Sequence, residues 1–312
     1  MKNSRIFLLI FSLILSFSFI EIALRIFGLN KHVIYYSSNY YGYYHVPNQN
    51  FKSRFNKLIT FDNLGNRNSK KFNIENTNLF FLGDSVTYGG SVVSNDETFS
   101  SLISKKMEKN YLNISSNGWG IPNIINFIDS HNIYKKNSVY VMTCINDCFT
   151  RNLRKIEQNF FFKKKDKLAI VTFYKLLIYN IYDSNTNEST DSYNNNKKLT
   201  KKDNLDTLKY SFNKLILFNE KLKKLNSKLI FVYSPNLNYL KSLLTGSEIA
   251  EEYIRMAIFD NLMKSDISYI DMAKHFDQKT LNNFGKFYID HVHLSREGHK
   301  LYSEILSKKI YD

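Results

Sequence analysis

The stretch FFLGDSVTYGG, residues 80–90, decides the fold of this chain. An apolar run ends at Gly83, Asp84 and Ser85 follow at once, and glycines close the stretch. A short apolar run that ends in this way is typical of a strand buried on both faces. The acid and the serine then have two interpretations. They cap a following helix, for which both residue types are ordinary, or Ser85 is a nucleophile presented at the end of a strand.

Similar apolar runs recur along the chain, separated by longer amphipathic stretches. The runs are Leu79–Leu82, Tyr111–Ile114, Val139–Thr143, Leu229–Tyr233 and Ile267–Ile270. Helices are expected between them, at about 98–109, 121–135, 205–226, 248–265 and from Ser295 to about 309. This alternation predicts an α/β fold, a flavodoxin-like three-layer α/β/α sandwich with a central parallel sheet of about five strands.

Polar residues and glycines follow the first three runs directly. Ser85 follows the first, SSNGWG (residues 115–120) with Gly118 follows the second, and CINDC (residues 144–148) with Asn146 follows the third. Ligands of open parallel sheets bind beyond the carboxyl ends of the strands. We therefore expect these residues to line one site.

The segment YIDHVHLSREGH, residues 288–299, supplies a base and an acid. Asp290 and His293 are three residues apart, close enough for the carboxylate to reach the ring on a turn. A serine needs an imidazole to take its proton, and the imidazole needs a carboxylate to fix its tautomer. His291 and His299 are the competing bases. His291 is expected to point elsewhere, and His299 to cap or pack within the last helix.

Four blocks of the chain resemble the SGNH/GDSL hydrolase superfamily, in the family's order over residues 78–309. The blocks are LGDSVTYG (82–89), NISSNGWG (113–120), Cys144-Ile145-Asn146-Asp147 and Asp290-His291-Val292-His293. The N-terminal part is similar to that of membrane-anchored members, with an apolar segment that ends in Glu and Arg and then NLGNRN (63–68).

The resemblance implies a role for each site residue. Ser85 is the nucleophile, His293 the base and Asp290 its orienting acid. The oxyanion hole consists of the Ser85 and Gly118 backbone N–H groups and the Asn146 side-chain amide. No metal or cofactor is implied, and Asp84 is expected to be structural.

The cysteines add one departure from the family pattern. Cys144 stands where the family usually has glycine, so its side chain either narrows the site and shifts Asn146 or is a small buried hydrophobic group. With only Cys144 and Cys148 there is no zinc pattern. A disulfide between them would require a backbone turn, because an extended segment holds the Cα atoms too far apart.

The N-terminus, MKNSRIFLLIFSLILSFSFIEIALRIFGL (residues 1–29), is almost wholly apolar from Ile6 to Ile20. A cleaved signal peptide fits the charged start, but no small-residue cleavage site follows. An uncleaved anchor fits better. Lys2 and Arg5 precede the run and favour a cytoplasmic N-terminus, so the expected location is the cell inner membrane, single-pass, with the catalytic domain periplasmic.

The chain is accordingly divided into an anchor (1–29), a tyrosine-rich arm (30–77) and a hydrolase domain (78–312) with an insertion at 148–204. The tyrosines of the arm have three interpretations: contact with the membrane interface, stacking on sugar rings, or packing on the domain. Within the insertion, FYKLLIYNIY (173–182) is expected to be helical and the polar stretch 182–204 to be a mobile loop. The insertion would serve as a lid or a membrane-facing flap.

The formal net charge of +15 has two explanations. It attracts anionic lipid, acidic glycan or nucleic acid, or it reflects a composition rich in Lys, Asn, Ile, Tyr and Phe. The basic residues are scattered and no nucleic-acid motif accompanies them, so composition is favoured and no nucleic-acid partner is expected.

The sequence thus predicts a serine-dependent ester hydrolase or O-acyl transferase that acts on O-acylated glycans of the cell envelope. Water or a sugar hydroxyl would resolve the acyl-serine, and the sequence does not distinguish the two. Two alternatives remain: a catalytically silent glycan-binding or polysaccharide-assembly protein on the same fold, and a basic nucleic-acid-binding protein.

Overall fold

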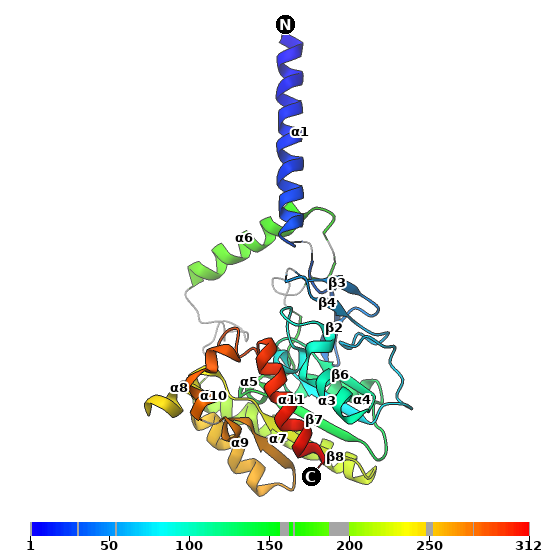
Figure 1. Ribbon diagram of the computed structural model, residues 1–312, viewed down its shortest axis with the longest axis vertical. Coiled ribbons are helices and arrows are strands. Elements are labelled where there is room, and N and C mark those ends of the chain that lie inside the picture. Colours follow the sequence, from blue (N-terminus) through cyan, green and yellow to red (C-terminus); the bar gives the residue numbers. More distant parts are fainter. Residues whose placement is uncertain are drawn as a thin grey trace.

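Five parallel strands form the central sheet, in the order β6-β5-β7-β8-β9 (Figure 1). The computed structural model describes residues 2–29, 31–53, 55–156, 162–164, 166–186, 200–247, 252–276 and 278–311. The predicted parallel sheet is confirmed, and each strand lies within about one residue of its predicted apolar run. The strands are β5 (Leu79–Gly83), β6 (Tyr111–Ser115), β7 (Val139–Cys144), β8 (Lys228–Tyr233) and β9 (Ser268–Asp271).

Helices cover both faces of this sheet, which confirms the three-layer architecture. Successive side chains of a strand point to opposite faces. Phe80 and Leu82 accordingly pack in one apolar cluster, whereas Leu79 and Phe81 pack in the other. The first cluster includes side chains from α4 (Ile121–Ser130), α7 (Lys201–Lys224) and α9 (Glu252–Lys264), and the second from α3 (Phe99–Met107), α8 (Leu237–Thr245) and α11 (Arg296–Tyr311).

Short helical segments connect these elements. They are α2 (Ser85–Tyr88), η1 (Asn95–Glu97), α5 (Asp147–Thr150), η2 (Met272–His275), α10 (Gln278–Asn282) and η3 (Phe284–Lys286).

The tyrosine-rich arm folds as two small antiparallel sheets against the domain. β1 (Tyr35–Ser38) pairs with β2 (Gly42–His45), and β3 (Asn50–Lys52) pairs with β4 (Leu58–Thr60). Four tyrosines, Tyr35, Tyr41, Tyr43 and Tyr44, are buried in the same apolar cluster as α4 and α7. For these four, the interpretation as packing residues is confirmed. Tyr40, by contrast, is 76% exposed.

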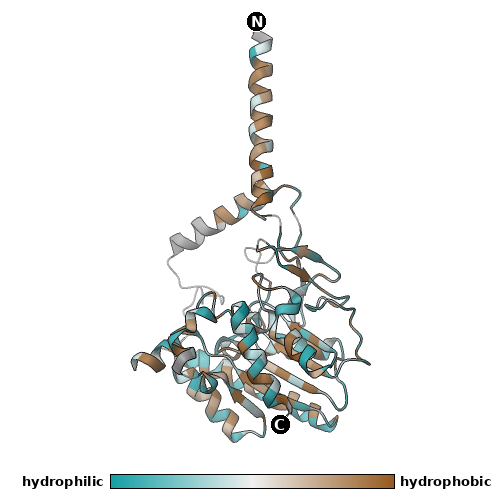
Figure 2. Cartoon of the chain, viewed as in Figure 1, coloured by the Kyte–Doolittle hydropathy of each residue, from teal (hydrophilic) through white to brown (hydrophobic). Residues whose placement is uncertain are grey.

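The N-terminal helix α1 (Lys2–Ile26) stands away from the domain (Figure 1). Its segment Ser4–Ile26 is apolar and long enough to cross a membrane, and only 6% of its most apolar window is buried. Figure 2 shows the apolar colouring along its whole length. One apolar N-terminal helix of this kind is consistent with a signal sequence or with a single-pass anchor.

The predicted mobile loop at 182–204 is partly wrong. Residues 182–186 are the end of α6 (Ala169–Thr186), and residues 201–204 begin α7, while 187–199 lie outside the described residues. Thr200 explains the early start of α7. Its hydroxyl accepts from the Asp203 N–H at 3.2 Å, and the Asp203 carboxylate accepts from the Thr200 N–H at 2.8 Å. This reciprocal capping box satisfies backbone groups that a helix start leaves open.

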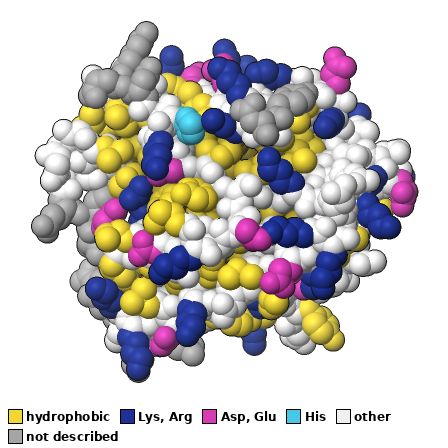
Figure 3. Space-filling view, turned by 90° about the horizontal axis from the view of Figure 1, so that it is seen from below, with side chains coloured by type: hydrophobic (Ala, Val, Ile, Leu, Met, Phe, Trp, Pro, Cys, Tyr) yellow, Lys and Arg dark blue, Asp and Glu magenta, His cyan; other side chains and the backbone are white. Residues whose placement is uncertain are grey.

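The surface opposite α1 mixes side chains of all types (Figure 3). Lys and Arg side chains are spread over this face between apolar and acidic ones, and they do not gather into one patch. This distribution agrees with the compositional explanation of the positive charge.

Candidate active site

The strand register brings three predicted site residues to one edge of the sheet. Gly83 pairs with Ser115 on one side and with Thr143 on the other. Ser85 lies two residues beyond Gly83, whereas Gly118 and Asn146 each lie three residues beyond its partners. The next two strands along the chain, β6 and β7, lie on opposite sides of β5. The strand order therefore reverses at β5, and ligands of such sheets bind at the carboxyl end of the strand where it reverses.

Asp84 closes the turn that presents Ser85. Its carboxylate accepts from the Val86 N–H at 2.9 Å and from the Cys148 thiol at 3.4 Å, and it is fully buried. Burial raises the pKa of Asp84, and the charges of Arg151 and His293 lower it in part. Gly83 is required before it, because a Cβ there would collide with the Thr143 carbonyl and the Thr87 hydroxyl. The expected structural role of Asp84 is thus confirmed: it caps α2.

The Asp290–His293 turn supplies the predicted base and acid. The Asp290 Oδ2 atom lies 2.6 Å from His293 Nδ1, and Asp290 Oδ1 accepts from the backbone N–H groups of His293 at 2.8 Å and Val292 at 2.9 Å. Burial opposes ionisation of Asp290, but these hydrogen bonds lower its pKa overall. A carboxylate on Nδ1 leaves Nε2 as the nitrogen that can take a proton from substrate or serine.

Two hydrogen bonds join this turn to the end of β8. The Leu237 N–H donates to the His291 carbonyl at 2.7 Å, and the Tyr288 hydroxyl donates to the Pro235 carbonyl at 2.9 Å. The neighbouring Ser234 N–H donates to the Cys144 carbonyl at 2.8 Å, at the end of β7. The turn is therefore joined through the end of β8 to the end of β7, the strand that precedes Asn146.

The competing histidines occupy different surroundings. His291 is exposed, whereas His299 is fully buried in α11 and accepts from the Phe99 N–H at 3.3 Å. Burial lowers the pKa of His299 to about 3, so it stays neutral and sealed within the fold. Neither Ser85 Oγ nor His293 Nε2 has a hydrogen-bond partner in the described part of the chain. The two atoms are thus not hydrogen-bonded to each other in this structure.

Gly118 carries a conformation that other residues rarely adopt. Its φ is +72°, in the left-handed region that favours glycine, and a Cβ there would also collide with the Arg154 guanidinium. The arm holds this loop, because the Tyr43 hydroxyl donates to the Asn117 carbonyl and the Trp119 indole donates to the Tyr43 carbonyl at 3.0 Å. Within the described residues, the Gly118 N–H has no acceptor, so it can donate to an incoming oxygen.

Tyr233 sets the direction of the Asn146 amide. The Tyr233 hydroxyl donates to Asn146 Oδ1 at 2.9 Å, which leaves the amide N–H₂ as the free donor. Burial raises the pKa of Tyr233 well above its ordinary value, so the hydroxyl keeps its proton. Sequence reasoning missed this residue. The available signal was that Tyr233 is the last residue of the fourth apolar run, at the same strand level as Cys144.

The side-chain amide of Asn146 is expected to contribute strongly to turnover. We predict that Asn146→Ala lowers kcat by roughly 10²–10³-fold with little change in folding, the usual loss for one oxyanion donor. Kinetics on a short-chain aryl ester, with circular dichroism as the folding control, measure this. A loss of less than about threefold in a folded variant would remove Asn146 from the site.

Tyr233→Phe tests the orienting hydrogen bond alone. Losing one hydrogen bond of about 0.5–1.5 kcal/mol should lower kcat by roughly two- to twelvefold, because the amide is no longer held toward the oxyanion. Tyr140→Phe is the matched control. Tyr140 is equally buried, and its hydroxyl donates to the Ile133 carbonyl, near the opposite end of the sheet. Equal effects of the two substitutions on kcat would contradict an orienting role.

Both cysteines are free and fully buried. Cys144 packs in the apolar cluster with α4 and α7, as expected for a small hydrophobic side chain. Cys148 donates its thiol to Asp84 and thereby supports the turn that precedes Ser85. The two thiols do not form a disulfide.

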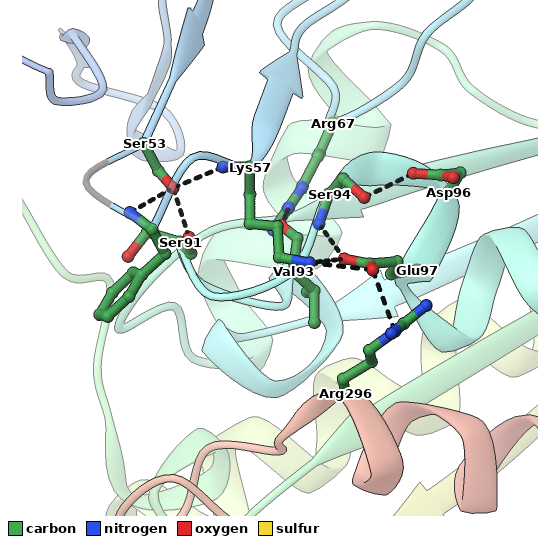
Figure 4. Close-up of polar contacts among 10 residues, drawn as sticks. Ser53, Lys57, Arg67, Ser91, Val93, Ser94, Asp96, Glu97 and Arg296 are labelled. Carbon is green, nitrogen blue, oxygen red and sulfur yellow. Dashed lines mark hydrogen bonds and ion pairs between the residues drawn. The ribbon is translucent and has the colours of Figure 1, made fainter.

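Two charged residues join the arm to the segments that carry Ser85 and His293 (Figure 4). Arg67 is buried, and its guanidinium donates to the carbonyls of Tyr88 at 2.5 Å, Gly90 at 2.6 Å and Val93 at 2.6 Å. Glu97 pairs with Lys57 at 2.8 Å and with Arg296 at 3.0 Å. Since Arg296 begins α11, this cluster fixes α2 and the start of α11 to the same arm.

Glu97 should make part of the stability pH-dependent. Burial opposes its ionisation, but hydrogen bonds from Lys57 and Ser94 lower its pKa from 4.5 to about 2. A lowered folded-state pKa contributes stability above the unfolded value, and this contribution is lost as the pH falls toward the folded value. We predict that the Tm advantage of wild type over Glu97→Gln shrinks as the pH falls from about 5 to about 2, roughly the range between these two pKa values. An advantage that stays constant over this range would contradict the assignment.

No protein-family model matches the chain, and no curated protein matches it. Among solved structures, it resembles a protein from Desulfitobacterium hafniense assigned to the G-D-S-L lipolytic family, with 13% identity, a TM-score of 0.45, and coverage of 75% of this chain and 99% of that one. It also resembles an acetyl xylan esterase (13% identity, TM-score 0.42, coverage 74% and 97%) and a carbohydrate esterase (14%, 0.42, 76% and 65%).

The chain has an α/β fold with a central five-stranded parallel sheet and an apolar N-terminal helix. Many solved structures that resemble it are SGNH or GDSL hydrolases and esterases. At these low identities the catalytic roles have to follow from the geometry of this chain's own residues.

Proposed function

We propose that this chain is a membrane-tethered serine ester hydrolase or O-acyl transferase, with its domain outside the cytoplasm. The proposal is supported by Ser85, Gly118 and Asn146, which follow neighbouring strands at one end of the sheet, and by the 2.6 Å Asp290–His293 pair on a turn joined to the end of β8. A serine, a base, an orienting acid and preorganised donors are the requirements for acyl transfer.

In the proposed reaction, Ser85 Oγ attacks the carbonyl carbon of an ester while His293 Nε2 takes the hydroxyl proton. The developing oxyanion accepts from the backbone N–H groups of Ser85 and Gly118 and from the Asn146 amide. Asp290 stabilises the protonated ring through Nδ1. The bond to the alcohol oxygen then breaks, and this oxygen leaves with the proton from His293.

The acyl-serine is resolved by a second attack. Water or a sugar hydroxyl attacks the acyl carbon and gives its proton to His293, which returns a proton to Ser85 Oγ as the acid or the new ester leaves. Hydrolysis and acyl transfer therefore use the same residues and differ in the acceptor.

Contacts at the base of α1 support retention of this helix as an anchor. The Glu21 carboxylate accepts from the Ala169 N–H at 2.9 Å and the Ile170 N–H at 3.0 Å, and Arg25 donates to the Lys167 carbonyl at 2.6 Å. A cleaved signal sequence would need no such contacts with the mature domain. Retention would place the domain at the outer surface of the inner membrane.

The proposed substrates are O-acyl groups, such as O-acetyl, on cell-envelope glycans. Tethering confines the site to the membrane surface and raises its effective concentration against lipid-linked or envelope glycans. The net charge of +15 would add attraction to acidic ones. Of the arm tyrosines, the four buried ones are not free to stack on sugars, which leaves the exposed Tyr40 and the half-buried Tyr36 as candidate contacts.

Two experiments test the proposed location of the domain and its proposed substrate. A periplasm-dependent reporter fused after residue 312 should be active, and a signal only from a cytoplasmic reporter would contradict the topology. Glycan O-acetylation should change in a deletion strain and in a Ser85→Ala strain alike. Acyl content equal to wild type in both would contradict the proposed substrate, and a change only in the deletion strain would favour a catalytically silent assembly protein.

A further inference from the structure

Helix α6 exposes an apolar surface that the described part of the chain does not cover. Within the first ten residues of α6 and the residue before it, six large apolar side chains are each at least 38% exposed. They are Leu168, Val171, Phe173, Tyr174, Leu177 and Ile178. Contiguous exposed apolar surface of this kind marks a protein or membrane contact.

The position of α6 is set by α1. Glu21 accepts hydrogen bonds from the first two backbone N–H groups of α6, those of Ala169 and Ile170. Glu21 is also the first charged residue after the apolar run, and Arg25 pairs with it at 2.6 Å. Glu21 and Arg25 lie in the last two turns of the apolar segment Ser4–Ile26, so the start of α6 would lie near the surface of a bilayer that α1 crosses.

From this point α6 runs outward from the base of α1 instead of continuing along its axis (Figure 1). Figure 2 shows the apolar colouring continuing from α1 into the first half of α6. A helix of 18 residues is about 27 Å long, enough to extend well beyond the radius of α1.

The charges beside this surface suit lipid headgroups. Lys163, Lys164, Lys167 and Lys175 are all exposed, and Asp166 pairs with Lys175 at 2.6 Å. Lysine and tyrosine side chains favour the membrane interface, where an apolar stem and a polar tip are both accommodated. A helix with basic residues beside bulky apolar ones is typical of segments that lie in the interface plane.

We propose that α6 is an interfacial helix that inserts its apolar side chains into the headgroup region of the bilayer that α1 spans. The proposal rests on the proposed anchoring of α1 and extends it. With Glu21 joining the two helices, the domain has two attachments to the bilayer, which fix its orientation. A hydrogen bond from Asn117 to the Tyr35 hydroxyl at 3.3 Å joins the loop that carries Gly118 to the arm that follows α1.

Single tryptophan substitutions in the full-length chain test this. Phe173→Trp reports on α6, Phe11→Trp on α1, and Leu217→Trp, on an exposed site of α7, is the matched control. Each variant is reconstituted into vesicles of phosphatidylcholine and phosphatidylglycerol with or without brominated acyl chains. The buried Trp119 contributes the same background to all three.

We expect bromolipid to quench the added fluorescence of Phe173→Trp and Phe11→Trp by at least half, and that of Leu217→Trp by less than a tenth. Quenching of Phe11→Trp with Phe173→Trp behaving like the control would overturn the α6 proposal and leave the anchor standing. The same conclusion holds if the fluorescence of Phe173→Trp is blue-shifted but not quenched, which is the result expected if a protein partner or a second copy of the chain covers α6. No quenching of Phe11→Trp would overturn the anchoring itself, and the α6 proposal with it.

Discussion

Ser85→Ala is expected to lower kcat for a short-chain aryl ester on the order of 10⁴-fold or more. The reason is that the acyl-enzyme cannot form without the Oγ atom, while the remaining donors only bind the carbonyl. The purified chain without residues 1–29 is the natural form for this assay if it folds, and the detergent-solubilised full chain serves otherwise.

Ser91→Ala is the matched control for this substitution. Ser91 lies six residues further along the same segment, and its carbonyl accepts from the Ser53 hydroxyl at 2.7 Å, so only its backbone has a structural role there. Wild-type activity is expected for this variant. Activity of Ser85→Ala equal to wild type would remove Ser85 from the mechanism.

His293→Ala is expected to lower kcat by roughly 10²–10⁴-fold, the usual contribution of a general base. His291→Ala should leave kcat nearly unchanged, since His291 is exposed and its backbone carbonyl, rather than its ring, bonds to Leu237. His299→Ala should lower thermal stability more than kcat, because the ring is buried against Phe99 at a centroid distance of 5.8 Å.

The ranking of the three histidines is the informative result. Kinetics and thermal unfolding, measured on the same preparations, separate loss of the base from loss of packing. A larger loss of kcat in folded His291→Ala than in His293→Ala would show that the Asp290–His293 pair is not the catalytic one.

Local sequence was enough to predict the sheet and its helices. Runs such as Val139–Thr143 are apolar at every position, because a strand covered on both faces has no solvent side. The site residues could be selected for a related reason. In a parallel sheet all strands end at the same edge, so Ser85, Gly118 and Asn146, each just after a run, had to lie near one another.

The parts that could not be predicted depend on contacts between segments distant in sequence. The hydrogen bond from Tyr233 to Asn146 requires the register between β7 and β8, which no local pattern encodes. The same holds for Arg67, whose partners are three carbonyls more than 20 residues away. The sequence pattern showed Glu21 only as the residue that ends an apolar run. In the structure its carboxylate caps α6, which begins 148 residues further along the chain.

The prediction of a loop at 182–204 was partly wrong for a different reason. Composition alone indicated a loop, but helix α7 begins inside it because Thr200 and Asp203 form a capping box. Capping depends on two side chains and overrides the average polarity of the segment around them.

The central claim is that Ser85 is an activated nucleophile, and labelling with a fluorophosphonate probe tests it most directly, since the probe needs no knowledge of the substrate. The account predicts that the folded wild-type chain is labelled at one site, that peptide mass spectrometry places the adduct on Ser85, and that Ser85→Ala and His293→Ala are not labelled. A folded wild-type chain that remains unlabelled, or labelling that persists in Ser85→Ala, would contradict it.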